Sequence, residues 1–149
     1  MLRLLPAQPD PRAAWASLLP VSEASPARAR QGTWFFLANC SGISEDVEDV
    51  AVLVVSELVT NACQAMQAGS VTGPACIELS LRRFEDRLLV EVIDSSPKAP
   101  VPNLAGDAGA EGGRGLVVVD RLSGEWGWFW RPGRKVVYCV LPLTAGEGN

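Results

Sequence analysis

Histidine is absent from this chain of 149 residues. Catalytic arrangements that need an imidazole, such as Ser-His-Asp and Cys-His, are therefore excluded within the chain. Histidine-ligated zinc and haem sites are excluded for the same reason. The chain also cannot accept a phosphoryl group on a histidine of its own.

Cysteine is scarce, and no two cysteines have C-x-x-C spacing, so zinc and thioredoxin-like motifs are missing. Because each lies in an apolar stretch, we expect four reduced core residues of a cytoplasmic protein, namely Cys40, Cys63, Cys76 and Cys139. The sequence has no run of about 18 apolar residues, the length that would suggest a membrane span. The N-terminal segment lacks the long apolar core of a secretory signal.

The chain also has no excess of basic residues, because it contains 13 Lys and Arg but 17 Asp and Glu. Such a surface is poorly suited to direct nucleic-acid binding, which depends on phosphate neutralisation. It does not exclude an anionic ligand, because backbone amides and a bound Mg²⁺ can hold phosphates. Hydrophobic residues make up 48% of the chain, and its length is typical of one globular domain, 1–149.

Three helices are predicted. The first is expected over Ser25–Cys40, with Ser25 as N-cap and Pro26 at the first helical position. A longer helix is expected from a Ser44 cap to about Gln67, because its apolar residues follow the spacing of one buried face. A short helix is expected over Gly115–Leu122.

Strands are predicted from alternating apolar residues. One hairpin is expected over Ala75–Arg83 and Arg87–Asp94, and a second over Glu125–Arg131 and Lys135–Leu143. A possible edge strand covers Ala13–Leu19 within the N-terminal segment 1–24. The element order predicts an α+β two-layer sandwich with helices on one face of a mixed or antiparallel sheet. Residues 95–113, rich in Pro and Gly, are expected to form a functional loop or lid, and 144–149 a frayed tail.

Three groups of residues can carry chemistry. Glu57 and Asn61 lie four positions apart on the long helix, so they share a face, either as a solvated stripe or as a base beside a Mg²⁺ ligand. Asp94 ends a strand, either as part of a turn or as a carboxylate that accepts a hydrogen bond from an amine such as that of adenine. Gly113 and Gly115 open a helix, either as a hinge or as a place where a ligand approaches the backbone.

Neither a Walker A loop nor a Rossmann fingerprint is present. Taken in order, the helix S-E-L-V-T-N-A, the strand end D-x-S-x-x-x-P, the loop and G-R-G-L resemble the ATP-binding domain shared by histidine kinases, gyrase, Hsp90 and MutL. Within that superfamily the chain is similar to stand-alone anti-sigma-factor serine/threonine kinases of actinobacterial regulators. The resemblance covers about 25–143.

The resemblance implies a binding site for Mg-ATP. Asn61 would hold the Mg²⁺, Glu57 would be the general base, and Asp94 would bind the adenine amine. Ser96 would line the adenine side, and the phosphate-facing end would consist of Gly113, Arg114, Gly115 and Leu116. The implied partners are a sigma factor and an antagonist protein, with a homodimer plausible by resemblance.

Two hypotheses follow. The first is an ATP-dependent serine/threonine kinase that phosphorylates an antagonist and sequesters a sigma factor, which Glu57 favours. The second is a regulatory module that binds nucleotide or a partner without turnover. It is favoured by Ala65, where relatives often have histidine, and by the lack of a hydroxyl residue in the segment 133–137.

The aromatic residues include five tryptophans. Trp126, Trp128 and Trp130 alternate, so they share one face of the last hairpin. They are expected either to pack against the helices or to form an exposed patch for a protein partner, which Trp15 and Trp34 could extend.

Overall fold

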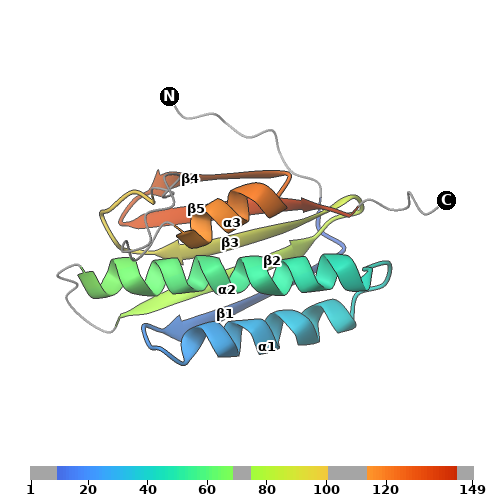
Figure 1. Ribbon diagram of the computed structural model, residues 1–149, viewed down its shortest axis with the longest axis horizontal. Helices are drawn as coiled ribbons and strands as arrows, with labels where there is room; N and C mark the ends of the chain where they lie inside the picture. Colours follow the sequence, from blue (N-terminus) through green and yellow to red (C-terminus); the bar gives the residue numbers. More distant parts are fainter. Residues whose placement is uncertain (1–9, 69–74, 101–113, 144–149) are drawn as a thin grey trace.

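A computed structural model describes residues 10–68, 75–100 and 114–143. The order of elements is β1 (Ala13–Pro20), α1 (Ser25–Ala38), α2 (Glu45–Ala68), β2 (Cys76–Arg83), β3 (Arg87–Asp94), α3 (Arg114–Leu122), β4 (Glu125–Arg131) and β5 (Arg134–Pro142). The three helices lie on one face of the sheet (Figure 1). The predicted α+β two-layer sandwich is therefore confirmed.

The five strands are ordered β1-β2-β3-β5-β4, and every neighbouring pair is antiparallel. β1 is an edge strand. The second strand of the last hairpin, β5, lies between β3 and β4. This arrangement places Lys135 of β5 opposite Asp94, the last residue of β3.

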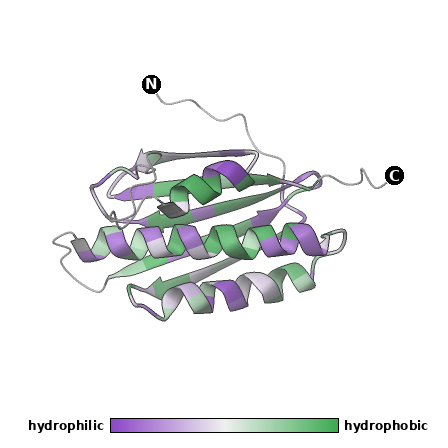
Figure 2. Cartoon of the chain, in the orientation of Figure 1, coloured by the Kyte–Doolittle hydropathy of each residue, from purple (hydrophilic) through white to green (hydrophobic). Residues whose placement is uncertain are grey.

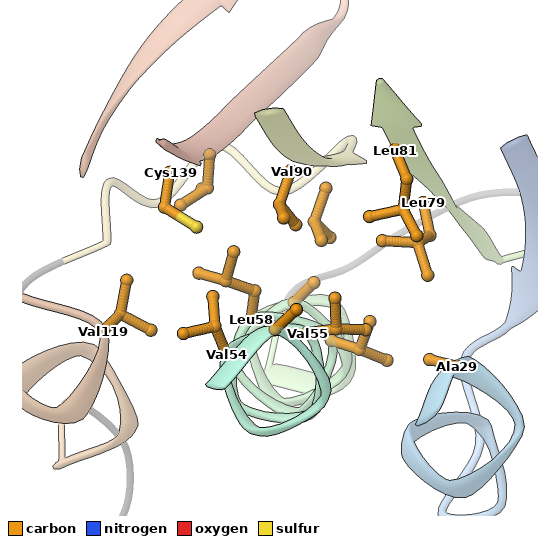
Figure 3. Packing of buried hydrophobic residues seen from close by; sticks show 14 of the residues in the cluster. Ala29, Val54, Val55, Leu58, Leu79, Leu81, Val90, Val119 and Cys139 are labelled. Carbon is orange, nitrogen blue, oxygen red and sulfur yellow. The ribbon is translucent and has the colours of Figure 1, made fainter. Parts of the chain in front are cut away.

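The core forms between α2 and the sheet, with α1 and α3 on either side of α2 (Figure 3). Fully burying a valine or leucine side chain in this core contributes about 1.5–3 kcal/mol to the stability of the fold. The buried residues labelled in the figure come from all of these elements and are Ala29, Val54, Val55, Leu58, Leu79, Leu81, Val90, Val119 and Cys139.

By length and hydropathy alone, α2 could cross a membrane over Glu45–Gln67. In this fold it is the central core helix, and it has an apolar face that packs on β2, β3 and β5. Its first turn carries Glu45, Asp46 and Glu48 and includes purple, hydrophilic segments in Figure 2. Among the described residues, no other helix meets this test.

The predicted start of α1 differs from the structure, whereas that of α2 agrees with it. Ala24, not Ser25, is the N-cap of α1, and the Ser25 hydroxyl donates to the carbonyl oxygen of Pro20 instead of capping the helix. The hydroxyl is thus used to join β1 to α1. The Ser44 cap of α2 is confirmed, because the Val47 N–H donates to Ser44 Oγ over 3.2 Å.

The cysteines are all free, but only two of the four are buried, so the expectation of four core residues is wrong. Cys63 and Cys139 belong to the core, and Cys40 is half-buried. Cys76 is exposed because it begins β2 on the alternate face from buried Ile77.

Candidate functional site

Asp94 lies at the end of β3 and is 3% exposed. Its Oδ1 accepts a hydrogen bond from the Ser96 backbone N–H over 2.8 Å. Its Oδ2 is buried and accepts no hydrogen bond within the described part of the chain. Leaving a buried polar atom unpaired costs free energy, so Oδ2 is suited to accept a donor from a ligand.

Lys135 lies opposite Asp94 on β5 and has no exposed surface. Its Nζ lies 3.5 Å from Asp94 Oδ1 and donates to the Lys98 carbonyl oxygen over 2.6 Å. Sequence reasoning did not single out this lysine as a site residue. A signal was available, because Lys135 falls on the same alternating face as Val137, Cys139 and Leu141.

The Asp94 carboxyl is subject to opposing electrostatic effects. Burial raises its pKa above the ordinary value of 3.8, while Lys135 and the hydrogen bond from Ser96 lower it, and the effect of burial is the largest. The pKa of the carboxyl therefore lies above the ordinary range for aspartate. Its ability to act as an acceptor depends on the lysine cation beside it.

Ser96 is also buried and links Asp94 to the segment that follows. The Ser96 backbone N–H donates to Asp94, and the Ser96 hydroxyl accepts a hydrogen bond from the Lys98 N–H over 3.2 Å. Two successive turns of this kind, in which a side chain accepts from a backbone N–H two residues on, fold the chain back at the end of β3. Asp94, Ser96 and Lys135 therefore form one connected cluster.

This cluster lies beneath the second half of α2. Ser95 Oγ lies 3.5 Å from the Met66 sulfur, which fixes the end of β3 against the helix. Burial raises the pKa of the Cys63 thiol on α2, the hydrogen bond to the Ser22 carbonyl oxygen lowers it, and the negative charge of Asp94 raises it. Asn61, two residues before Cys63, is half-buried.

Glu57 lies one turn before Asn61 and meets the start of α3. A methyl group added at Gly115 would lie 2.3 Å from Glu57 Oε2 and 3.2 Å from Glu57 Cβ. Glycine therefore allows this close approach of α3 with the Glu57 carboxylate in its present position, whereas a larger residue would require that carboxylate to shift. The structure thus brings together Glu57 and Gly115, two residues that the sequence separates widely.

The profile of the histidine kinase-like ATPase domain matches residues 20–140 of this chain. The chain belongs to this family. Its fold is similar to the crystal structure of the RsbU and RsbW domains of Rv1364c from Mycobacterium tuberculosis, with a TM-score of 0.63 and 17% identity. That match covers 88% of this chain but only 32% of the solved chain. No curated protein matches the chain at a significant level.

In this histidine kinase-like ATPase domain, the cluster of Asp94, Ser96 and Lys135 fits the adenine base of a nucleotide. A buried Oδ2 without a donor matches the need of an exocyclic amine for an acceptor. In residues 10–68, 75–100 and 114–143, no three His, Cys, Asp or Glu side chains gather as a metal site. A Mg²⁺ at Asn61 would thus need phosphate oxygens as further ligands, as is usual for this ion.

Of the remaining predicted site residues, some lie within the described part of the chain and one does not. Gly113 lies outside the described residues. Arg114 begins α3, and Leu116, two residues later, is a core residue of the ATPase domain. No contact tests the expected roles of these three residues in nucleotide binding, so they remain predictions.

The three tryptophans of β4 lie on the helix-covered face of the sheet, but only one is packed into it. Trp126 contacts the core and donates from Nε1 to Asp120 of α3 over 2.9 Å. Trp128 and Trp130 are 37% and 48% exposed and meet edge to face, 5.3 Å apart. Trp126 is therefore packed against the helices, as one interpretation expected, and Trp128 and Trp130 are exposed, as the other expected, while a protein partner at this patch remains a prediction.

Proposed function

We propose that this ATPase domain binds Mg-ATP and acts in the cytoplasm as a serine/threonine kinase of the anti-sigma-factor type. Its substrate would be a small antagonist protein, and its second partner a sigma factor. The observation that carries nucleotide binding is the buried Asp94 Oδ2 at the end of β3, to which none of the described residues donates. The similarity to a structure that contains an RsbW domain supports the regulatory class.

Each end of the site has a proposed task. Asp94 Oδ2 accepts a hydrogen bond from the adenine amine, while Oδ1 accepts one from the Ser96 backbone N–H. Asn61 offers its amide oxygen to Mg²⁺, which neutralises charge on the phosphates. The N-terminus of α3, with Gly115, faces the phosphate end.

Glu57 is the proposed base for transfer. Its carboxylate takes the proton from the hydroxyl of the substrate serine as that oxygen bonds to the γ-phosphorus. The bond from the γ-phosphorus to the bridging oxygen breaks, and ADP leaves. The closeness of Glu57 to Gly115 supports this role, because it holds the carboxylate where α3 begins.

A second candidate is a regulatory module that binds nucleotide or a protein partner without turnover. Ala65 and the segment 133–137, which has no hydroxyl residue, favour it. The exposed Trp128 and Trp130 suit a protein partner in either case, because tryptophan is enriched at the energetic centres of interfaces.

The test is calorimetric titration of ATP with and without Mg²⁺. We expect saturable binding that needs Mg²⁺, weakened at least about tenfold by Asn61→Ala. The control is Gln64→Ala, at an exposed position on the same helix, which should bind like wild type. Unchanged affinity in Asn61→Ala would refute its role as a metal ligand.

A labelled γ-phosphate separates the two candidates. With the antagonist protein present, a kinase transfers the label to serine, and Glu57→Ala is expected to bind ATP but transfer nothing. Binding without transfer by the wild type would favour the regulatory module. Normal transfer by Glu57→Ala would remove Glu57 as the base.

A further inference from the structure

Lys135 is the largest fully buried side chain among the described residues, and it carries a charge. A buried ammonium group is costly unless it is paired and hydrogen-bonded. Its position on the helix-covered face of β5 would ordinarily hold an aliphatic residue, as at Val137 and Cys139 further along the strand. The site described above uses it only to support Asp94.

The hydrogen bonds at this charge pair leave groups free on both partners. An ammonium group has three protons, and Lys135 Nζ meets two acceptors in the described part of the chain, the Lys98 carbonyl oxygen and Asp94 Oδ1. Asp94 Oδ1 accepts from the Ser96 N–H and lies beside Lys135 Nζ, whereas Oδ2 accepts no hydrogen bond from the described residues. One spare donor therefore lies beside one spare acceptor.

A donor beside an acceptor matches one edge of adenine. The 6-amino group of that base is a donor, and the adjacent ring nitrogen N1 is an acceptor. A carboxylate alone can recognise the amine but can make no hydrogen bond to N1. The cation of Lys135 supplies the missing donor at a short distance from the carboxylate.

We propose that Lys135 is a specificity-determining residue, which donates to N1 of the base while Asp94 accepts from the 6-amino group. The proposal rests on the proposed nucleotide site. A hydrogen bond from a charged donor in a buried site is strong, so loss of N1 should be costly. Bases that lack either half of the donor–acceptor pair should bind more weakly than adenine.

The test compares ATP with 1-deaza-ATP, in which a C–H group replaces N1 and the amine is kept. We expect wild type to bind ATP about tenfold or more tightly than 1-deaza-ATP, by calorimetry. Lys135→Met should bind the two nucleotides almost equally. Lys135→Gln, which keeps an amide donor, should recover part of the preference.

A matched control is Lys98→Met. This lysine is exposed and contacts Lys135 only through its backbone, so the preference for ATP should be unchanged. Thermal unfolding of each variant without nucleotide reports folding separately from selectivity. If Lys135 were merely structural, Lys135→Met would lower the affinities for ATP and 1-deaza-ATP together and leave their ratio at the wild-type value.

The outcomes are distinct. Equal binding of the two nucleotides by wild type overturns the role of Lys135 without the use of any variant, while ATP binding itself stands. A preference that survives in folded Lys135→Met overturns it as well. If wild type binds no ATP at all, the proposed function fails, and the role of Lys135 fails with it.

Discussion

The two ends of the candidate site are built differently. At the strand end, Asp94, Ser96 and Lys135 are buried and joined by hydrogen bonds and an ion pair. At the helix end, Glu57 and Asn61 are half-buried, and neither side chain makes a hydrogen bond with another described residue. The helix end is instead fixed by the close packing of Glu57 on Gly115.

The difference separates two ways of preparing a site. Hydrogen bonds within the strand-end cluster depend on the register of β3 and β5 and exist without a ligand. The helix-end side chains keep their polar groups available, which suits groups that must bind a metal or move a proton. Substitutions at the strand end should therefore alter stability as well as ligand binding, and substitution of Glu57 or Asn61 should mainly alter ligand chemistry.

The largest effect is expected for Asp94→Ala. This substitution leaves the buried Lys135 ammonium without its counter-ion, which typically costs about 3–5 kcal/mol. Urea unfolding at neutral pH measures the loss. Glu85→Ala, at an exposed carboxylate paired with Arg12, should change stability by less than about 0.5 kcal/mol.

A double variant sharpens that result. Asp94→Ala with Lys135→Met removes both charges, and most of the lost stability should return. A double variant as unstable as Asp94→Ala would mean that the unpaired cation is not the cause.

A smaller effect is expected at the helix end for Gly115→Ala. The added methyl group would displace the Glu57 carboxylate, but alanine also favours a helix by up to about 1 kcal/mol over glycine. We expect a net loss of about 1 kcal/mol in wild type and a gain in a Glu57→Gly background. Urea unfolding of the four proteins of this cycle gives the coupling, and purely additive effects would argue against the contact.

The smallest effect is a dependence on pH with opposite signs for stability and affinity. Because burial raises the pKa of Asp94, the folded protein takes up its proton before the unfolded chain does. Between that raised pKa and 3.8, falling pH therefore favours the folded state through this group. ATP affinity should fall over the same window, because the protonated carboxyl is a poorer acceptor.

Unfolding and ATP titrations over a pH series check both signs. Asp94→Asn lacks the ionisable group, so both trends should flatten in that variant. An affinity that falls equally in Asp94→Asn would assign the titration to another group.

Much of the fold could be predicted because its signals are local. The apolar face of α2 and the alternation in β2 and β3 reflect burial of each element by itself. The Ser25 cap was wrong because a tertiary partner, the Pro20 carbonyl oxygen, takes the hydroxyl. Cys76 was misjudged because composition does not tell which face of a strand a residue occupies.

The candidate site was less accessible to sequence reasoning. Asp94 and Glu57 stood out because polar groups interrupted apolar segments. The alternation of β5 indicates that Lys135 is buried, but its pairing with Asp94 and the Glu57–Gly115 contact join residues distant in the sequence, which periodicity does not reveal. Only the insertion of β5 between β3 and β4 brings the lysine to Asp94.

That insertion gives the charge pair a role during assembly of the sheet. A shift of β5 by one residue would turn Lys135 to the opposite face and bring Val136 beneath the helices. Asp94 would then be buried with no cation beside it. The pair therefore favours the native register of β5 on β3. Asp94 and Lys135 are paired only in this register, which also forms the strand end of the proposed nucleotide site.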